Sequence, residues 1–299
     1  MDAWNSLFQR SRRMRAHQDP ARGFPGASAL PVPTGWAGRQ MSVLFTFSMG
    51  FLSMLALAMV AGAVSAVRSG ELGAVVVLAV GAFILAHVVA FSVHSRRLRR
   101  GAGRPPALVD LPASGRGVRF AYSAWPYYLL VAVLVMSVLV TGLVAVAAAT
   151  AGVVGVVLVV AFAALAVTVG WFVVTMLRLA PGELVLSPAG IHHRGLTFTQ
   201  FVPWRDVYQV SAESIHTPIL VVKANMSDDT RVRHYMGRFG TLESRLVPFV
   251  AVRPYWLATN PVTVYHVVAF YHSHLDLQPE LGTLLAMERI ANGRAKVPQ

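Results

Sequence analysis

Residues 120–177 read FAYSAWPYYLLVAVLVMSVLVTGLVAVAAATAGVVGVVLVVAFAALAVTVGWFVVTML and contain no charged side chain. As one helix this run of 58 residues would be roughly 87 Å long, whereas the hydrocarbon core of a bilayer is about 30 Å thick. The run is therefore expected to fold back on itself. We place the reversal at Ala149–Gly152, where small residues interrupt the Val/Leu pattern.

Two more uncharged runs precede this pair, at residues 41–67 and 72–93. Each is long enough to cross a bilayer, and Arg68–Glu71 between them is short enough for a tight hairpin. A transmembrane β-barrel would need strands that alternate apolar and polar residues, and these runs do not alternate. The sequence therefore predicts four transmembrane helices in two hairpins.

The arginines predict the orientation of these helices, because cytoplasmic loops of membrane proteins are enriched in Lys and Arg. The side opposite to the termini carries only Arg68, offset by Glu71. We therefore expect an integral, multi-pass protein of a bacterial inner (plasma) membrane, with both termini cytoplasmic. The arginines on the expected cytoplasmic side are Arg10, Arg12, Arg13, Arg15, Arg22, Arg39, Arg96, Arg97, Arg99, Arg100, Arg104, Arg116, Arg119 and Arg178.

The formal net charge of +13 is mostly this orientation signal, so we expect no binding of nucleic acid. The densest cluster follows the second apolar run, where arginines attract anionic phospholipids by about 1 kcal/mol each. The cluster is either a lipid contact or an orientation signal only. Its members, our candidates for anionic-lipid contact, are Arg96, Arg97, Arg99 and Arg100.

The rest of the chain divides around the apolar runs. Residues 1–40 are expected to be a flexible basic tail, 41–94 the first transmembrane hairpin, 95–125 a basic cytoplasmic loop rich in Pro and Gly, and 126–178 the second hairpin. Residues 179–299 are expected to form a cytoplasmic α+β domain. Strand patterns occur at 183–187, 191–194, 197–202, 207–212, 219–224 and 246–253, and helical spacing begins at Pro261.

The stretch from Gly182 to Arg194, followed by Phe201-Val-Pro-Trp-Arg-Asp-Val, resembles the opening of bacterial pleckstrin-homology-like domains. The chain is also similar to four-span actinobacterial membrane proteins that carry such a domain at the C-terminus. The resemblance covers about residues 179–253. It implies a curled sheet closed by C-terminal helices, with a structural corner in which Gly190 has a positive φ. The matching positions are Pro188, Gly190, Ile191, Pro203, Trp204, Asp206 and Val207.

The resemblance implies a binding module rather than an enzyme. Relatives with this fold often bind phosphoinositides through a basic loop between the first two strands, but here that loop, Ser187–Gly190, has no Lys or Arg. No catalytic motif is present and Cys is absent, so we expect no catalytic residue, cofactor or metal site. The candidates for contact with a protein partner are Arg231, Arg233 and Arg238.

These observations favour a non-enzymatic inner-membrane adaptor that presents a pleckstrin-homology-like domain to a protein partner. Such an adaptor would be an accessory subunit of a cell-envelope or transport complex. The alternative is a membrane protein that senses a lipid or another ligand through the juxtamembrane arginines and the interior of the helix bundle.

The predicted orientation has a direct test. A reporter enzyme fused after Gln299 is expected to show cytoplasmic activity, and the same reporter inserted at Gly70 is expected to show external activity. External activity from the C-terminal fusion would contradict the cytoplasmic assignment of the domain.

Overall fold

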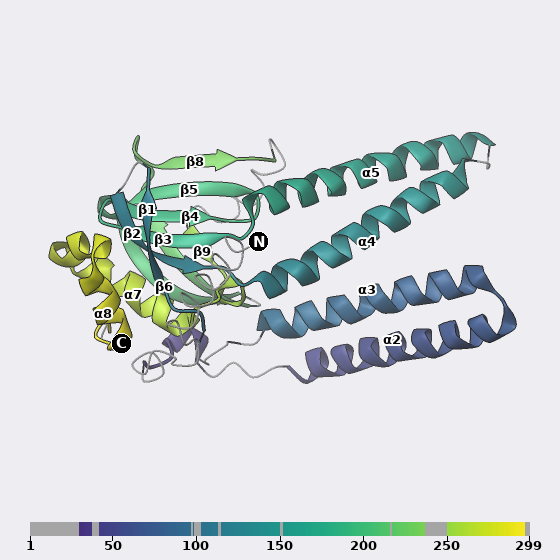
Figure 1. The fold of residues 1–299 in the computed structure, drawn as a ribbon, viewed down its shortest axis with the longest axis horizontal. Helices are drawn as coiled ribbons and strands as arrows, with labels where there is room; N and C mark the ends of the chain where they lie inside the picture. Colours follow the sequence, from purple (N-terminus) through teal and green to yellow (C-terminus); the bar gives the residue numbers. More distant parts are fainter. Residues whose placement is uncertain are drawn as a thin grey trace, which may run out of the picture.

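The computed structural model describes residues 30–37, 42–96, 98, 103–112, 115–149, 152–215, 217–236 and 250–296. Four long helices project from one side of a domain built on two β-sheets (Figure 1). The elements in chain order are η2 (Thr34–Trp36), α2 (Val43–Ser69), α3 (Leu72–Arg96), β1 (Ala107–Leu111), β2 (Gly115–Ala121), α4 (Ala124–Ala148), α5 (Gly152–Leu179), β3 (Glu183–Ser187), β4 (Gly190–Arg194), β5 (Phe198–Pro203), η3 (Trp204–Asp206), β6 (Val207–Ile215), β7 (Thr217–Ala224), β8 (Arg231–His234), β9 (Val250–Val252), η5 (Pro254–Trp256), α7 (Pro261–Ser273), η6 (Leu275–Gly282) and α8 (Leu284–Ala291).

In the described residues, α2, α3, α4 and α5 are long and apolar enough to cross a membrane. The prediction of four spans in two hairpins is confirmed at this level, and an antiparallel sheet domain follows them. Local chemistry sets the helix ends. The side chain of Ser42 accepts a hydrogen bond from the Phe45 amide at 3.1 Å, and Gly70 ends α2 with a φ of 77°. Gly152 has a φ of 62° at the second reversal.

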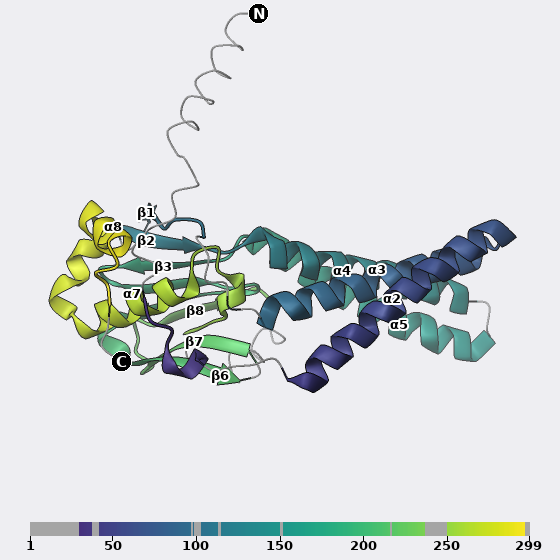
Figure 2. The same ribbon diagram turned by 90° about the horizontal axis from the view of Figure 1, so that it is seen from below.

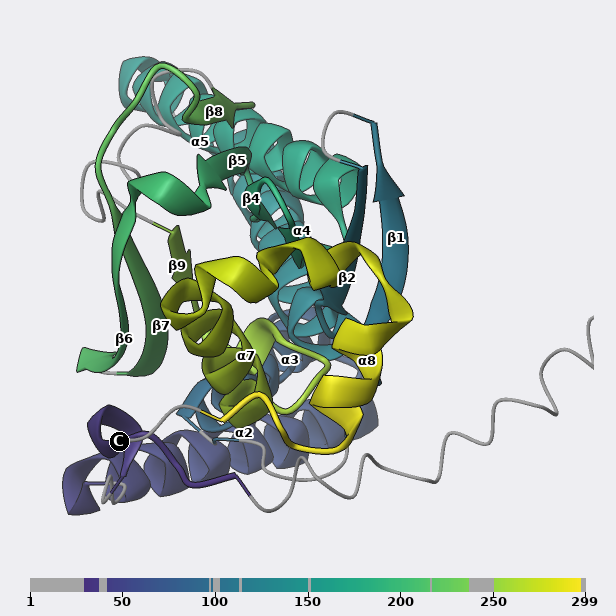
Figure 3. The same cartoon turned by 90° about the vertical axis from the view of Figure 1, so that its left-hand side faces the viewer.

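The four helices form a row rather than a closed bundle. Helix α2 packs on α3, α3 on α4, and α4 on α5, while α2 and α5 lie at opposite ends of the row (Figures 1 and 3). In the most apolar window of each helix only 6–11% of the residues are buried. The interior expected for a bundle is therefore replaced by broad apolar faces.

The larger sheet has six strands in the order β1-β2-β3-β4-β5-β8, all antiparallel. Here the structure differs from the expectation that residues 95–125 form a loop. Strands β1 and β2 lie in that segment, and β2 adds to the sheet beside β3. The reason is the alternation in Gly115–Ala121, which buries Val118 and Phe120 completely while Arg119 faces the other way. The sheet domain is therefore not confined to residues 179–299.

The second hairpin is inserted between two neighbouring strands of this sheet. Strand β2 leads into α4, and α5 leads back into β3, which pairs with β2 from Ala121↔Glu183 to Val118↔Leu186. At the junction the Tyr122 amide donates to the Gly182 carbonyl at 3.0 Å. The Gly182 amide donates to the hydroxyl of Tyr127 on α4 at 2.9 Å. The α4–α5 hairpin and the larger sheet are therefore joined by hydrogen bonds at this junction.

The smaller sheet, β6-β7-β9, faces the larger one across helix α7 (Figure 3). Helix α7 is apolar nearly all round, which is typical of a helix inside a core. Helix α8 covers the end of the domain away from the membrane helices (Figure 2). The helical spacing predicted from Pro261 is confirmed, and it accounts for the fully buried side chains of Val264, Val267, Val268 and Tyr271.

Residues 30–37 are packed against the domain, in contrast to the flexible tail predicted for residues 1–40. Trp36 is 4% exposed, and its indole N–H lies 3.0 Å from the Glu213 carbonyl oxygen and 3.2 Å from that of Ile219. His266 on α7 donates through Nε2 to the Pro31 carbonyl at 2.8 Å. Burial of a large aromatic side chain explains the order of this segment. Residues 1–29 and 38–41 lie outside the described residues.

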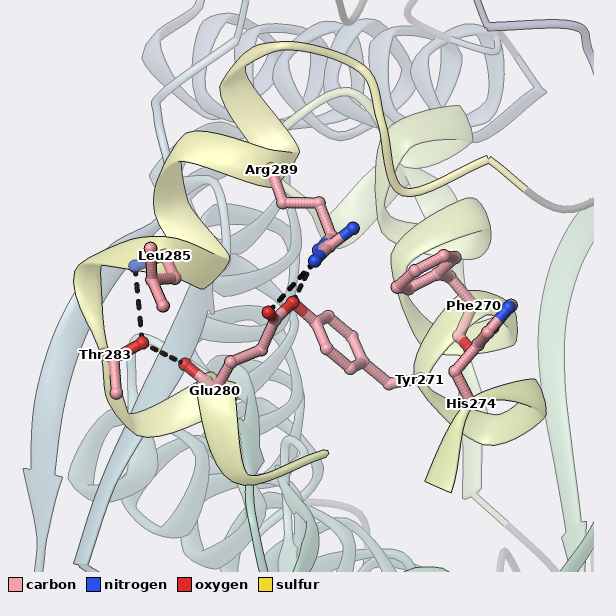
Figure 4. A network of polar contacts seen from close by, with 7 residues as sticks. All are labelled: Phe270, Tyr271, His274, Glu280, Thr283, Leu285 and Arg289. Carbon is pink, nitrogen blue, oxygen red and sulfur yellow. Dashed lines mark hydrogen bonds and ion pairs between the residues drawn. The ribbon is translucent and has the colours of Figure 1, made fainter. Parts of the chain in front are cut away.

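The carboxylate of Glu280 on η6 links helices α7 and α8 through hydrogen bonds. Glu280 accepts hydrogen bonds from Tyr271 Oη at 2.6 Å and from Arg289 Nε at 2.6 Å and Nη2 at 3.1 Å (Figure 4). Burial acts to raise the pKa of Glu280, but these hydrogen bonds and the Arg289 charge outweigh it and hold the pKa below its ordinary value. Thr283 then caps α8 by accepting from the Leu285 amide.

Glu280→Gln is expected to lower the free energy of unfolding by about 1.5–3 kcal/mol, because it weakens charged hydrogen bonds at a half-buried site. Glu288→Gln, on the exposed face of α8, is the matched control and should change stability by less than about 0.5 kcal/mol. Thermal unfolding of the detergent-solubilised chain, followed by tryptophan fluorescence, measures both. Equal melting temperatures for the two variants would contradict the role given to Glu280.

Candidate functional site

The face of the six-stranded sheet turned away from α7, here called the outer face, carries polar side chains in two cross-strand rows. Residues paired directly across antiparallel strands point to the same face. The first row is Glu183, Arg194, Thr199 and Arg233. The second row is Arg119, Val185, His192, Phe201 and Arg231.

Glu183 holds two arginines of these rows in place. Arg119 Nε lies 2.7 Å from Glu183 Oε2, and Arg194 Nη2 lies 3.0 Å from Glu183 Oε1. Arg194 also donates to the Pro181 carbonyl at 3.0 Å. The Glu183 side chain is 20% exposed, so this ion triad is partly shielded from water. The triad leaves one positive charge in excess.

A cleft of about 340 Å³ lies over the two rows. We call it the basic cleft and define it by Glu183, His192, Arg194, Thr199, Arg231 and Arg233, with Val185 and Phe201 also lining it. Within the described residues neither Arg231 nor Arg233 forms an ion pair; the nearby Asp229 pairs with Arg205 instead. Burial lowers the pKa of His192, whose ring lies 4.4 Å from that of Phe201. The cleft therefore presents three arginines and one glutamate.

The first row is the one nearer to the membrane helices. Glu183 begins β3 four residues after Leu179, the last residue of α5. In Figure 1 the strands β3, β4, β5 and β8 run toward the ends of α4 and α5. Exposed aromatic side chains, which are common at membrane–water interfaces, lie near these helix ends: Trp125 and Tyr128 in the first two turns of α4, and Trp171 eight residues before the end of α5. The first row of the basic cleft therefore lies at the end of the sheet nearer to the membrane helices.

Behind the cleft lies a buried histidine. His193 is 4% exposed, and its Nε2 lies 2.7 Å from the Tyr122 hydroxyl. Burial lowers the pKa of His193 to about 4, because the charged imidazolium would lose its hydration. His193 is therefore neutral at physiological pH, and its contact with Tyr122 ties β4 to the junction with α4.

The residues predicted for the structural corner lie together at the opposite end of β3–β5. Gly190 pairs with Pro203, and Trp204, 3% exposed, donates through Nε1 to the Ser187 carbonyl at 2.8 Å. Asp206 accepts a hydrogen bond from the Ser227 hydroxyl. The expectation of a positive φ at Gly190 is wrong. Glycine is needed there because a Cβ would lie 2.3 Å from the Val202 carbonyl oxygen.

The structure describes only some of the residues predicted to contact lipid or a protein partner. Arg96 ends α3, and its guanidinium lies 3.9 Å from the centre of the Phe45 ring on α2. Arg231 and Arg233 lie on the edge strand β8 and line the basic cleft. The candidates that lie outside the described residues are Arg97, Arg99, Arg100 and Arg238.

Several histidines of the described residues make packing and hydrogen-bond contacts within the fold. His87, within the membrane part, lies 3.3 Å through Nε2 from the Tyr128 hydroxyl and links α3 to α4. His272 donates to the Val207 carbonyl at 3.1 Å, and His274 stacks on Phe270. In the part of the chain that the structure describes, no group of three or more His, Cys, Asp or Glu side chains is placed to hold a metal ion.

Sequence reasoning did not single out Arg119, Glu183 or Arg194. The signal for Arg119 was the alternation in residues 115–121, which places it opposite to the buried Val118 and Phe120. No local sequence pattern indicates the triad as a whole, because its three residues lie on β2, β3 and β4, and the inserted hairpin separates β2 from β3 in the sequence. Comparison with known proteins found no matching family, and no curated protein or solved structure matched the chain.

The low pKa of His193 makes stability depend on pH. The unfolded imidazole has a pKa near 6.5, so the unfolded state gains a proton first as the pH falls below about 6.5. The stability that neutral His193 contributes above that pH is lost between about 6.5 and 4, to an extent of about 3 kcal/mol. His193→Gln is expected to flatten this decline in melting temperatures measured from pH 7.5 to 4.5. An unchanged slope in the variant would show that His193 is not its source.

Proposed function

We propose that this chain is a non-enzymatic adaptor of a bacterial inner membrane and an accessory subunit of an envelope or transport complex. Its four helices anchor a pleckstrin-homology-like sheet domain on the cytoplasmic side, with both termini on that side. The observation that carries the proposal is an apolar groove along α2 and α3, which we assign to a transmembrane helix of a protein partner.

The groove has a volume of about 750 Å³ and is lined from Ser53 to Val67 on α2 and from Val75 to Ala90 on α3. About 15 helical residues span roughly 22 Å, most of the hydrocarbon thickness. Small residues at such a place let another helix approach closely, whereas lipid chains do not need them. The small side chains that line the groove are Ala56, Ala63, Ala79, Ala82, Ala86 and Ala90.

The open row of helices supports the same proposal. A helix pair with few buried positions gains packing energy when a further helix fills its exposed groove, since dispersion contacts drive helix association in lipid. The corner at Gly190, Pro203 and Trp204, together with the C-terminal helices, supports the pleckstrin-homology-like assignment.

Filling the groove tests the adaptor role. The variant Ala79→Leu/Ala86→Leu adds bulk at two exposed alanines of the groove, and Ala161→Leu/Ala164→Leu adds the same bulk on the exposed face of α5. The full chain is purified from its host in mild detergent, and co-purifying proteins are quantified by mass spectrometry. We expect a stoichiometric membrane partner with the wild type and the α5 control, and at least a tenfold loss with the groove variant.

A photo-crosslinking residue at position 86 identifies the occupant directly. A crosslink to a transmembrane segment of the co-purified protein supports the proposal. Crosslinks to lipid alone, or to a second copy of this chain alone, would contradict it, as would equal loss of the partner from both double variants.

A further inference from the structure

We propose that the basic cleft binds the phosphate group of an anionic ligand, supplied by a lipid headgroup or by free phosphate. This inference goes beyond the adaptor role, which rests on the α2–α3 groove. It also concerns a different place from the loop Ser187–Gly190, which lies at the far end of β3 from the membrane helices.

Positive charge in the cleft exceeds negative charge. Glu183 is already engaged by Arg119 and Arg194, and Arg194 Nε is buried without a hydrogen-bond partner. Within the described residues Arg231 and Arg233 have no carboxylate partner. A guanidinium that lacks a carboxylate is suited to the oxygens of a phosphate, which it meets with two parallel N–H donors.

The form of the site also suits a phosphate. Arg194 and Arg233 flank Thr199 in the first row, and all three residues line the cleft. In the second row the rings of His192 and Phe201 lie against each other, next to Arg231. A volume of about 340 Å³ is at the small end of the range for ligand pockets, about 300–1,000 Å³. This volume suits a phosphate ester.

The cleft also lies at the end of the sheet nearer to the membrane helices. Glu183, in the first row, follows the end of α5 by four residues, and the exposed Trp125 and Tyr128 lie in the first two turns of α4. At that depth arginines are attracted to anionic lipids, and the attraction decays within about 10 Å of the surface at moderate salt. A headgroup in the cleft would hold the sheet domain against the membrane.

The test compares two variants with the same change in net charge. Arg231→Gln/Arg233→Gln removes the two cleft arginines that have no carboxylate partner in the described residues; Arg233 lies 5.1 Å from the centre of the Tyr235 ring. Arg116→Gln/Arg205→Gln removes two exposed arginines of the same domain that are already paired with Asp110 and Asp229. The full chain, in a zwitterionic detergent, is titrated with short-chain phosphatidylglycerol, with inorganic phosphate and with short-chain phosphatidylcholine, and binding is followed by tryptophan fluorescence.

We expect phosphatidylglycerol to bind the wild type and the control with similar affinity, and to bind the cleft variant at least tenfold more weakly. Preference for phosphatidylglycerol over inorganic phosphate identifies a lipid headgroup as the source, and equal affinity identifies free phosphate. Equal weakening in both variants, equal binding of phosphatidylcholine, or no binding by the wild type would each overturn the proposal. Melting temperatures within about 2 °C of the wild type show that both variants are folded. Loss of the membrane partner is not among these readouts, so the adaptor role is tested separately.

Discussion

The pairing of β2 with β3 is the contact on which the rest of the structure depends. These strands are separated in sequence by the whole α4–α5 hairpin, yet they are neighbours from Ala121↔Glu183 to Val118↔Leu186. A hairpin of two spanning helices returns its two ends to the same membrane surface, because the helices cross in opposite directions. Those two ends are therefore already close, and an antiparallel ladder between the strands costs little additional loop closure. The junction bonds of Tyr122, Tyr127 and Gly182 then join the helices to the sheet.

The register of the β2–β3 ladder also decides which side chains are buried and which reach the outer face. Side chains alternate across β2 and β3, so Phe120 and Leu184 enter the core while Arg119 and Glu183 reach the outer face. The apolar half of each strand packs against α7 and the smaller sheet. The polar half forms an ion triad and the basic cleft beside the helix ends. Burial of the core and exposure of the charged residues on the outer face thus follow from one register.

The membrane part contributes little packing of its own. Its helices contact their sequential neighbours and leave broad faces exposed, so the packing of α3 on α4 and the sheet domain together hold the two hairpins in place. Helix α3 is tied to the domain by Phe91, whose ring lies 5.8 Å from that of Tyr255, and helix α4 by Tyr127, whose ring lies 4.8 Å from that of Trp256. This arrangement leaves the α2–α3 groove available to a partner helix.

The sequence by itself determined the four spans, their pairing into hairpins, most strands from Glu183 to Ala224 and the helix after Pro261. Each of these depends on local patterns: uncharged length, period-two alternation or helical spacing. Only the tertiary structure decided that residues 107–121 join the sheet, that Trp36 docks on β6 and β7, and that Gly190 is needed for a close approach to Val202. It alone assembled Arg119, Glu183 and Arg194. These features arise between segments far apart in the chain, and no local pattern specifies which distant backbone or charge a residue will meet once the apolar surfaces are buried.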